Sequence, residues 1–283
     1  MKSNRNNQAL LIGINDYGGV GDLRGCINDV TNLRNVLKTF YGFTNEQIRV
    51  LIDERAKREN ILYRLRKMVK GANPGDYLVF HFSGHGSQIR DRDDDELMDH
   101  MDELICPYDM DWDGIYITDD MLGDILGELA EGVIMEVILD CCHSGTGTRF
   151  DEWGRPEDLG PMYPVVNRYL PPPVDIACRY EDEEHKLQSK RAFRNDQRIV
   201  MNHVLWAGCK DHQTAADAYI DGTYNGAFTY YLCKHLRNCK GSLTREELHE
   251  RVVHSLKHHQ YFQIPTLECA EKMKSQPFLA FPA

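Results

Sequence analysis

The 283-residue sequence contains no long apolar run. None of its apolar stretches reaches the roughly 18 residues that a membrane-crossing helix requires, so a membrane is not an expected partner. The N-terminal residues 1–8 are polar and lack the apolar centre of a secretion signal. We therefore expect a cytoplasmic protein.

Basic residues are in the minority, with 33 Lys and Arg against 44 Asp and Glu and a formal net charge of −11. This balance argues against nucleic acid as a partner and suits the attraction of cationic ligands. The nine cysteines include no pair of C-x-x-C clusters, and in a reducing compartment most of them should be free thiols.

Short apolar runs alternate with segments of helical spacing. The length allows one large domain or two small ones. The alternation of strands and helices predicts an α/β fold with a mostly parallel sheet and right-handed crossovers. Strands are predicted over residues 9–14, 49–52, 77–82 and 133–139, and helices over 26–40, 60–69 and from the capping residue Thr118 onwards.

The regular pattern stops between residues 149 and 200, where prolines and mixed charges prevail. A loop of this length is usually functional or mobile. After the linker, the sequence again predicts regular elements: a strand over 203–207 and helices over 227–236 and 244–256. We therefore divide the chain into a larger first part (1–148), an irregular linker (149–200) and a smaller part (201–283) that completes the same fold.

Two glycine-flanked segments follow the third and fourth predicted strands. One contains His85 and the other contains Cys142. Functional sites of parallel sheets lie beyond the carboxyl ends of the strands. A thiol nucleophile needs a base beside it and N–H donors for the oxyanion, and glycines allow the backbone to approach a substrate. The alternative is that His85 only ends a strand and that the cysteines are inert core thiols.

The segments HFSGHGSQ (81–88) and LDCCHSGT (139–146) closely resemble the two catalytic motifs of metacaspases and the related orthocaspases. The resemblance covers about residues 9–148 and continues more weakly over about 200–280, which is most of the chain. The resemblance implies a caspase-like three-layer α/β/α sandwich and a cysteine endopeptidase. It also implies Cys142 as nucleophile rather than Cys141, and His85 as general base rather than His143. Backbone N–H groups near Gly86 and Cys142 would hold the oxyanion.

The same resemblance implies a pocket for a basic side chain. Asp29 and Asp140 match its acidic residues, and Cys26 and Ser83 match accessory positions. A buried carboxylate pair favours a bound guanidinium or ammonium. We therefore expect protein or peptide substrates with Arg or Lys before the scissile bond. Asp29 has an alternative interpretation as a first-turn carboxylate that the helix dipole favours.

An acidic run spans residues 91–103 and is typical of a solvated loop, although clustered carboxylates also suit calcium. The resemblance implies calcium ligands at Asp102, Asp119 and Asp120. Arg149 stands where a fourth ligand is expected, and Asp151 is two residues further on. Activation by calcium or by self-cleavage within 149–200 is therefore a hypothesis.

Two other functional classes stay open at this point. One is a catalytically inactive caspase homologue that acts as a binding module. The other is a different Cys-His amidohydrolase, which would not need a cation pocket.

Overall fold

A six-stranded sheet forms the centre of the computed structural model, which describes residues 6–18, 21–90, 101–142, 163–177, 203–210 and 213–280. Its strand order is β12-β9-β7-β3-β1-β2. Five strands run parallel, and β12 pairs antiparallel with β9 at one edge. The strands are β1 (Gln8–Gly13), β2 (Ile48–Ile52), β3 (Tyr77–Ser83), β7 (Ile134–Asp140), β9 (Val204–Ala207) and β12 (Thr266–Glu268).

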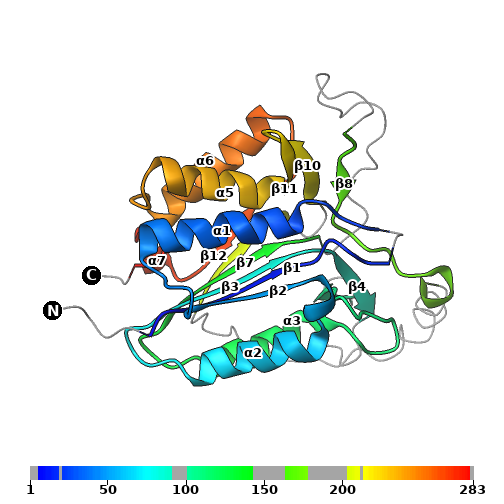
Figure 1. Cartoon of the computed structure of the whole chain (residues 1–283), viewed down its shortest axis with the longest axis horizontal. Helices are drawn as coiled ribbons and strands as arrows, with labels where there is room; N and C mark the ends of the chain where they lie inside the picture. Colours follow the sequence, from blue (N-terminus) through cyan, green and yellow to red (C-terminus); the bar gives the residue numbers. More distant parts are fainter. Residues whose placement is uncertain are drawn as a thin grey trace, which may run out of the picture.

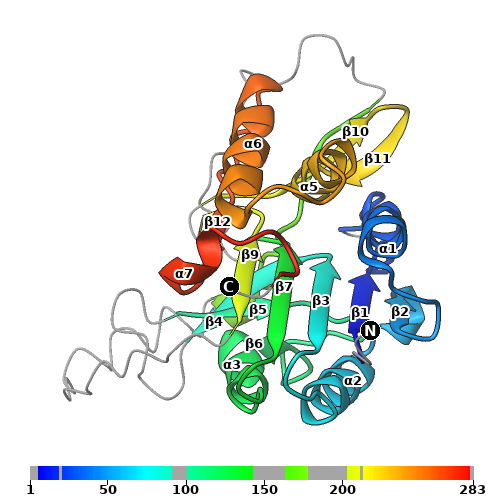
Figure 2. The same ribbon diagram turned by 90° about the vertical axis from the view of Figure 1, so that its left-hand side faces the viewer.

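Helices cover both faces of this sheet, which gives the predicted three-layer α/β/α sandwich (Figures 1 and 2). One face carries α1 (Cys26–Tyr41), α5 (Ala227–Asn238) and α6 (Arg245–His258), and the other carries α2 (Arg58–Lys70) and α3 (Asp119–Gly127). The short elements η1 (Asp53–Arg55) and α7 (Glu271–Lys274) complete the set of labelled helices.

Two predicted helix starts are confirmed. The Thr118 side chain accepts a hydrogen bond from the N–H of Met121, and Thr244 forms a capping box with Glu247. The part of the chain beyond residue 200 adds β9 and β12 to the same sheet. No helix within the described ranges has the length and apolar character needed to cross a membrane.

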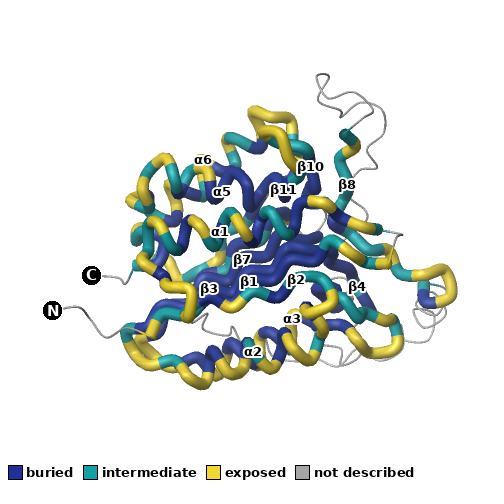
Figure 3. Tube along the Cα trace, in the orientation of Figure 1, coloured by how far each residue is buried: buried dark blue, intermediate teal, exposed yellow. Residues whose placement is uncertain are grey.

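Burial on both faces explains why the central strands read as unbroken apolar runs. Along β1, Leu11 packs into the core below α1 and α5, whereas Leu10 and Ile12 pack into the core against α2 and α3. Figure 3 shows the central strands buried and the outer sides of the helices exposed. This rigid double core holds the strand ends, where the candidate site lies.

Two small sheets at the carboxyl ends of the central strands correct the sequence prediction. The first contains β4 (Gly86–Arg90), β5 (Met101–Ile105) and β6 (Ile117–Thr118), and the second contains β8 (Val166–Asn167), β10 (Ala216–Ile220) and β11 (Thr223–Gly226). Asp102 and Glu103 lie in β5 and not in a solvated loop, because their strand pairs with β4. The strand β8 lies within the linker that was predicted to be irregular, because its pairing partner is distant in sequence.

Candidate active site

Strand register brings His85 and Cys142 to the same end of the sheet. Ser83 at the end of β3 pairs with Asp140 at the end of β7, and the two candidate residues each follow two positions later. The backbones are so close here that a Cβ on Gly86 would collide with the carbonyl oxygen of Cys142. Only glycine fits at this position.

The His85 ring is held from one side. Its Nε2 lies 2.5 Å from the carbonyl oxygen of Gly21. A carbonyl only accepts, so Nε2 carries the hydrogen, and Nδ1 of the neutral ring carries a free lone pair. Nδ1 is buried and has no hydrogen-bond partner within the described ranges. The hydroxyl of Tyr17 accepts from the His85 N–H at 2.9 Å, and the two rings lie 4.7 Å apart.

Burial lowers the pKa of His85, although its hydrogen bond to Gly21 opposes this effect. The ring is therefore neutral at neutral pH, with an unprotonated Nδ1. This is the form in which an imidazole acts as a general base.

Cys141 and Cys142 point to opposite sides, as strand alternation predicts. Cys141 packs in the core on the α2 and α3 side. Cys142 belongs to a small cluster with Cys209, Ala215 and Tyr169. Its sulfur accepts from the N–H of Ala215 at 2.5 Å. The competing base His143 lies outside the described residues.

Two backbone N–H groups converge on one oxygen beside this thiol. Gly86 and Cys142 both donate to the carbonyl oxygen of Arg168, at 3.0 and 3.2 Å. These are the two N–H groups that were predicted to hold an oxyanion. Paired donors aimed at one carbonyl oxygen are the geometry that stabilises a tetrahedral intermediate.

The predicted acidic pocket surrounds the guanidinium of Arg168. Arg168 Nη2 lies 2.8 Å from Asp29 and 3.1 Å from Asp217, and Nη1 lies 3.2 Å from Asp140. All four side chains are fully buried. Ser83 accepts from Nη1 at 2.8 Å and donates to Asp29 at 2.7 Å. The pocket thus brings together the predicted Asp29, Asp140 and Ser83.

Cys26 and the carboxylate of Asp29 both belong to the first turn of α1. Asp29 accepts from the N–H of Gly226, from Ser83 and from Arg168, so its partners lie outside its own helix. Asp29 therefore has the first-turn position of the alternative interpretation and also these partners outside its helix. Burial raises the pKa of the Cys26 thiol, which therefore stays neutral beside these charges.

The charges of the pocket require a cation. With every group ionised, three carboxylates face one guanidinium, which leaves a net charge of −2. Burial raises the pKa of Asp29, while the adjacent guanidinium of Arg168 acts in the opposite direction and favours the ionised carboxylate. Burial also opposes the charge of Arg168, but Asp140 and its neighbours outweigh this and raise the pKa of Arg168. Without a cation, some of these buried carboxyl groups would take up protons instead of staying ionised.

Comparisons with known proteins show the family of this chain. A family model described as "Metacaspase, peptidase C14 domain" matches residues 7–150. The chain belongs to the metacaspase family. Metacaspase-1 of Pyricularia oryzae is 32% identical over 95% of this chain and 73% of its own length. Metacaspase-1 of Ajellomyces capsulatus is 30% identical over 95% of this chain and 81% of its own length. This metacaspase is therefore a cysteine-type peptidase that acts on proteins or peptides.

Solved structures place the metacaspase in the caspase-like fold. A Geobacter sulfurreducens protein superposes with a TM-score of 0.67 at 26% identity, covering 95% of this chain and 97% of the other. Caspase-1 of Spodoptera frugiperda superposes with a TM-score of 0.57 at 14% identity, covering 96% and 88%. The second similarity supports the fold alone.

The structure adds several residues to this candidate site that the sequence analysis did not assign to it. Asp217 lies within a segment, 207–217, that resembled the family, but the pattern did not distinguish it from neighbouring polar residues. Arg168 was one of many basic residues in the linker. Gly21 and Ala215 act through backbone atoms, and Tyr17 through its hydroxyl and ring, so no side-chain motif indicated them.

The predicted calcium ligands lie on β5 and at the start of α3. Asp102 is buried, whereas Asp119 and Asp120 are exposed. Carboxylates suit a hard cation, but the described part of the chain contains no group of three or more His, Cys, Asp or Glu side chains that could hold a metal. Residues 91–100, Arg149 and Asp151 lie outside the described residues. Calcium binding therefore stays a prediction.

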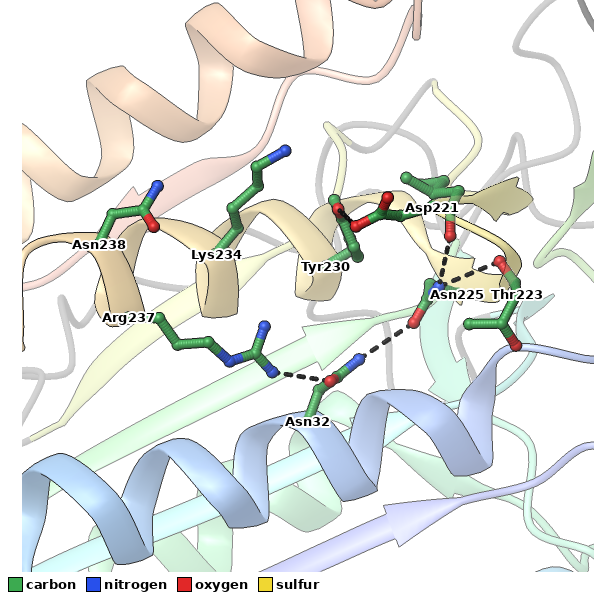
Figure 4. A pocket seen from close by; sticks show the side chains of 9 residues that line it. Asn32, Asp221, Thr223, Asn225, Tyr230, Lys234, Arg237 and Asn238 are labelled. Atoms are coloured by element: carbon green, nitrogen blue, oxygen red, sulfur yellow. Dashed lines mark hydrogen bonds between the residues drawn. The ribbon is translucent and has the colours of Figure 1, made fainter.

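A second, polar pocket lies beside β11 and α5 (Figure 4). Its volume is about 290 Å³. Asn32 donates to Asn225 at 3.0 Å, and Asp221 accepts from the hydroxyl of Tyr230 at 3.0 Å. None of the predicted site residues lines it, so its residues provide control positions for tests of the active site.

Proposed function

We propose that this metacaspase is an endopeptidase that cleaves after Arg or Lys through a Cys142–His85 dyad. One observation carries the proposal. A single arginine has its side chain among three carboxylates and its carbonyl oxygen on the two N–H groups beside Cys142. A substrate arginine before the scissile bond would need the same two contacts.

The proposed chemistry begins with transfer of the Cys142 proton to Nδ1 of His85. The sulfur then attacks the scissile carbonyl carbon, and the carbonyl electron pair moves to the oxygen held by Gly86 and Cys142. Collapse of this intermediate expels the amine, which takes the proton from His85, and leaves a thioester on Cys142. Water hydrolyses the thioester, with His85 again as base. The lowered pKa of His85 supports this role, since it keeps the ring neutral before the reaction.

The proposed specificity follows from charge. A planar guanidinium can donate to several carboxylates at once, so Arg should be accepted at least as well as Lys. An Asp would add another negative charge to a buried site that already holds three carboxyl groups. Repulsion of several kcal/mol in such a site corresponds to discrimination of about a thousandfold or more.

A matched set of fluorogenic peptides tests the proposal. The peptides differ only in the residue before the scissile bond, which is Arg, Lys, citrulline or Asp. We expect cleavage of the Arg and Lys members, strong loss with the uncharged citrulline, and no detectable cleavage with Asp. Comparable cleavage of the Arg and Asp peptides would overturn the pocket assignment. No cleavage of any peptide, and no labelling of Cys142 by a thiol-reactive Arg peptide, would favour an inactive binding module.

A further inference from the structure

The linker segment from Val166 to Leu170 lies along the candidate active site, with strand β8 over Val166–Asn167 and an isolated parallel bridge between Tyr169 and Gly86. On one side, β8 pairs antiparallel with β10, and the N–H of Arg168 donates to the carbonyl of Ala215 at 3.0 Å. On the other side, the N–H of Leu170 donates to the carbonyl of Gly86 at 2.9 Å. Ser87 also donates to the carbonyl of Leu170 at 2.6 Å. Backbone pairing of this kind is how a peptide strand binds to an exposed strand edge.

Arg168 makes the two contacts that a substrate residue before the scissile bond would make. Its guanidinium fills the acidic pocket, and its carbonyl oxygen accepts from Gly86 and Cys142. The following residue, Tyr169, packs in the same small cluster as Cys142. The carbonyl carbon between Arg168 and Tyr169 is therefore the one presented to the nucleophile.

We infer that the Arg168–Tyr169 bond is a self-cleavage site, and that the uncut segment keeps the pocket closed to other substrates. This inference rests on the proposed function. The thiol proton moves to His85, and the sulfur forms a bond to the carbonyl carbon of Arg168. The C–N bond to Tyr169 breaks, and its amine leaves with the proton from His85. Water then releases Arg168 as a carboxylate and restores the Cys142 thiol.

Tethering gives the uncut segment its advantage over other substrates. Arg168 is attached to the same chain as its pocket, so its effective concentration there greatly exceeds that of a dilute peptide. Its guanidinium is fully buried, so another arginine must first displace it. Cleavage at Arg168 removes the covalent connection across the cleft. External Arg peptides should therefore be hydrolysed after a lag that matches self-cleavage.

Mass spectrometry and N-terminal sequencing of the incubated full-length protein locate the cut. Wild type should yield a chain that ends at Arg168 and a chain that begins at Tyr169, and Cys142→Ala should yield neither. Arg168→Lys should still be cut, since it retains the cation. Arg168→Ala should lose this cut and hydrolyse Arg peptides without a lag. The matched control Arg179→Ala, an arginine of the same linker, should behave as wild type.

Two outcomes of this experiment separate the inference from the proposed function. Hydrolysis of Arg peptides by wild type without a lag and without a cut at Arg168 would overturn the inference alone. A cut whose rate constant rises in proportion to protein concentration would overturn the intramolecular assignment. An intramolecular rate should change by less than about twofold over a roughly hundredfold dilution.

A thermal-shift experiment tests occupation of the pocket without any catalysis. Agmatine, a small guanidinium compound, is added to Cys142→Ala and to the double variant Cys142→Ala with Arg168→Ala. It should raise the melting temperature of the double variant by a few degrees or more, and leave the single variant unchanged, since ligand binding stabilises only a pocket that is free. An equal shift in both would overturn the inference. A shift in neither would overturn the cation pocket on which the proposed function depends.

Discussion

Replacement of Asp29 by Asn should separate the charge of the pocket from its shape. The Oδ2 atom of Asp29 accepts from Arg168 at 2.8 Å and from Ser83 at 2.7 Å, and the carboxylate also accepts from the N–H of Gly226. An amide of the same shape can keep an acceptor for Gly226. Its NH2 group would then face the guanidinium, so a charge-assisted acceptor is replaced by a donor.

The expected loss follows from the burial of these groups. Removing one partner of a buried, hydrogen-bonded charge pair costs about 2–5 kcal/mol. This corresponds to a loss of about 30-fold to a few thousandfold in kcat/KM for an Arg peptide. The assay is best performed in the Arg168→Ala background, because there the bound arginine does not compete with the peptide. Cleavage of a citrulline peptide should change far less than cleavage of the Arg peptide.

Asp221→Asn provides the matched control. This aspartate lies in the second pocket, where its carboxylate accepts from Tyr230, and its φ of 56° is a conformation that Asn tolerates well. The control should retain the activity of its parent. A loss of less than about threefold in Asp29→Asn, or an equal loss with Arg and citrulline peptides, would refute the assignment of Asp29 as a ligand for the substrate cation.

Three further predictions concern the thiol, the calcium hypothesis and a buried histidine. Cys142→Ala should abolish peptide cleavage while Cys141→Ala retains much of it, and full activity in Cys142→Ala would rule out this nucleophile. Millimolar calcium should raise the rate of peptide cleavage and Asp119→Ala should remove the response, whereas a flat chelator-to-calcium titration would contradict calcium activation. Burial lowers the pKa of His81 to about 3. As the pH falls below about 6.5, His81 is protonated in the unfolded chain before it is protonated in the folded protein. The stability contributed by the neutral, buried His81 is therefore complete above pH 6.5 and is lost as the pH falls towards 3. His81 can change the free energy of unfolding by at most ~1.4 kcal/mol per pH unit. The urea midpoint of the wild type should therefore fall more steeply with decreasing pH than that of His81→Gln. Equal pH dependence of the two midpoints would contradict this prediction.

That His85 and Cys142 lie at the same end of the sheet was predictable, because local pattern and sheet rules suffice to place these two candidate residues there. Apolar runs located β3 and β7, and parallel strands share one carboxyl end, so His85 and Cys142 had to be neighbours. The pocket residues Asp29 and Asp140 were predicted from the resemblance to metacaspases, and the structure places the first in the first turn of α1 and the second at the end of β7.

The segment that fills the site was not predictable from local pattern. Strand β8 has two residues, too few for a recognisable alternation, and its partner β10 lies beyond the rest of the linker. The contact between Arg168 and Asp29 spans 139 positions of the sequence. Sequence reasoning marked the linker as a place for self-cleavage, but the choice of one arginine requires the contacts of its side chain and carbonyl.

Covalent trapping tests the Cys142 nucleophile and its specificity most directly. The incubated wild-type protein is treated with a peptidyl chloromethyl ketone that carries Arg, and with a matched reagent that carries Asp, and the modified residue is mapped by mass spectrometry. We predict a single adduct, on Cys142, with the Arg reagent and none with the Asp reagent. An adduct on Cys141 or on another of the nine cysteines in place of Cys142, or equal modification by both reagents, would contradict the account.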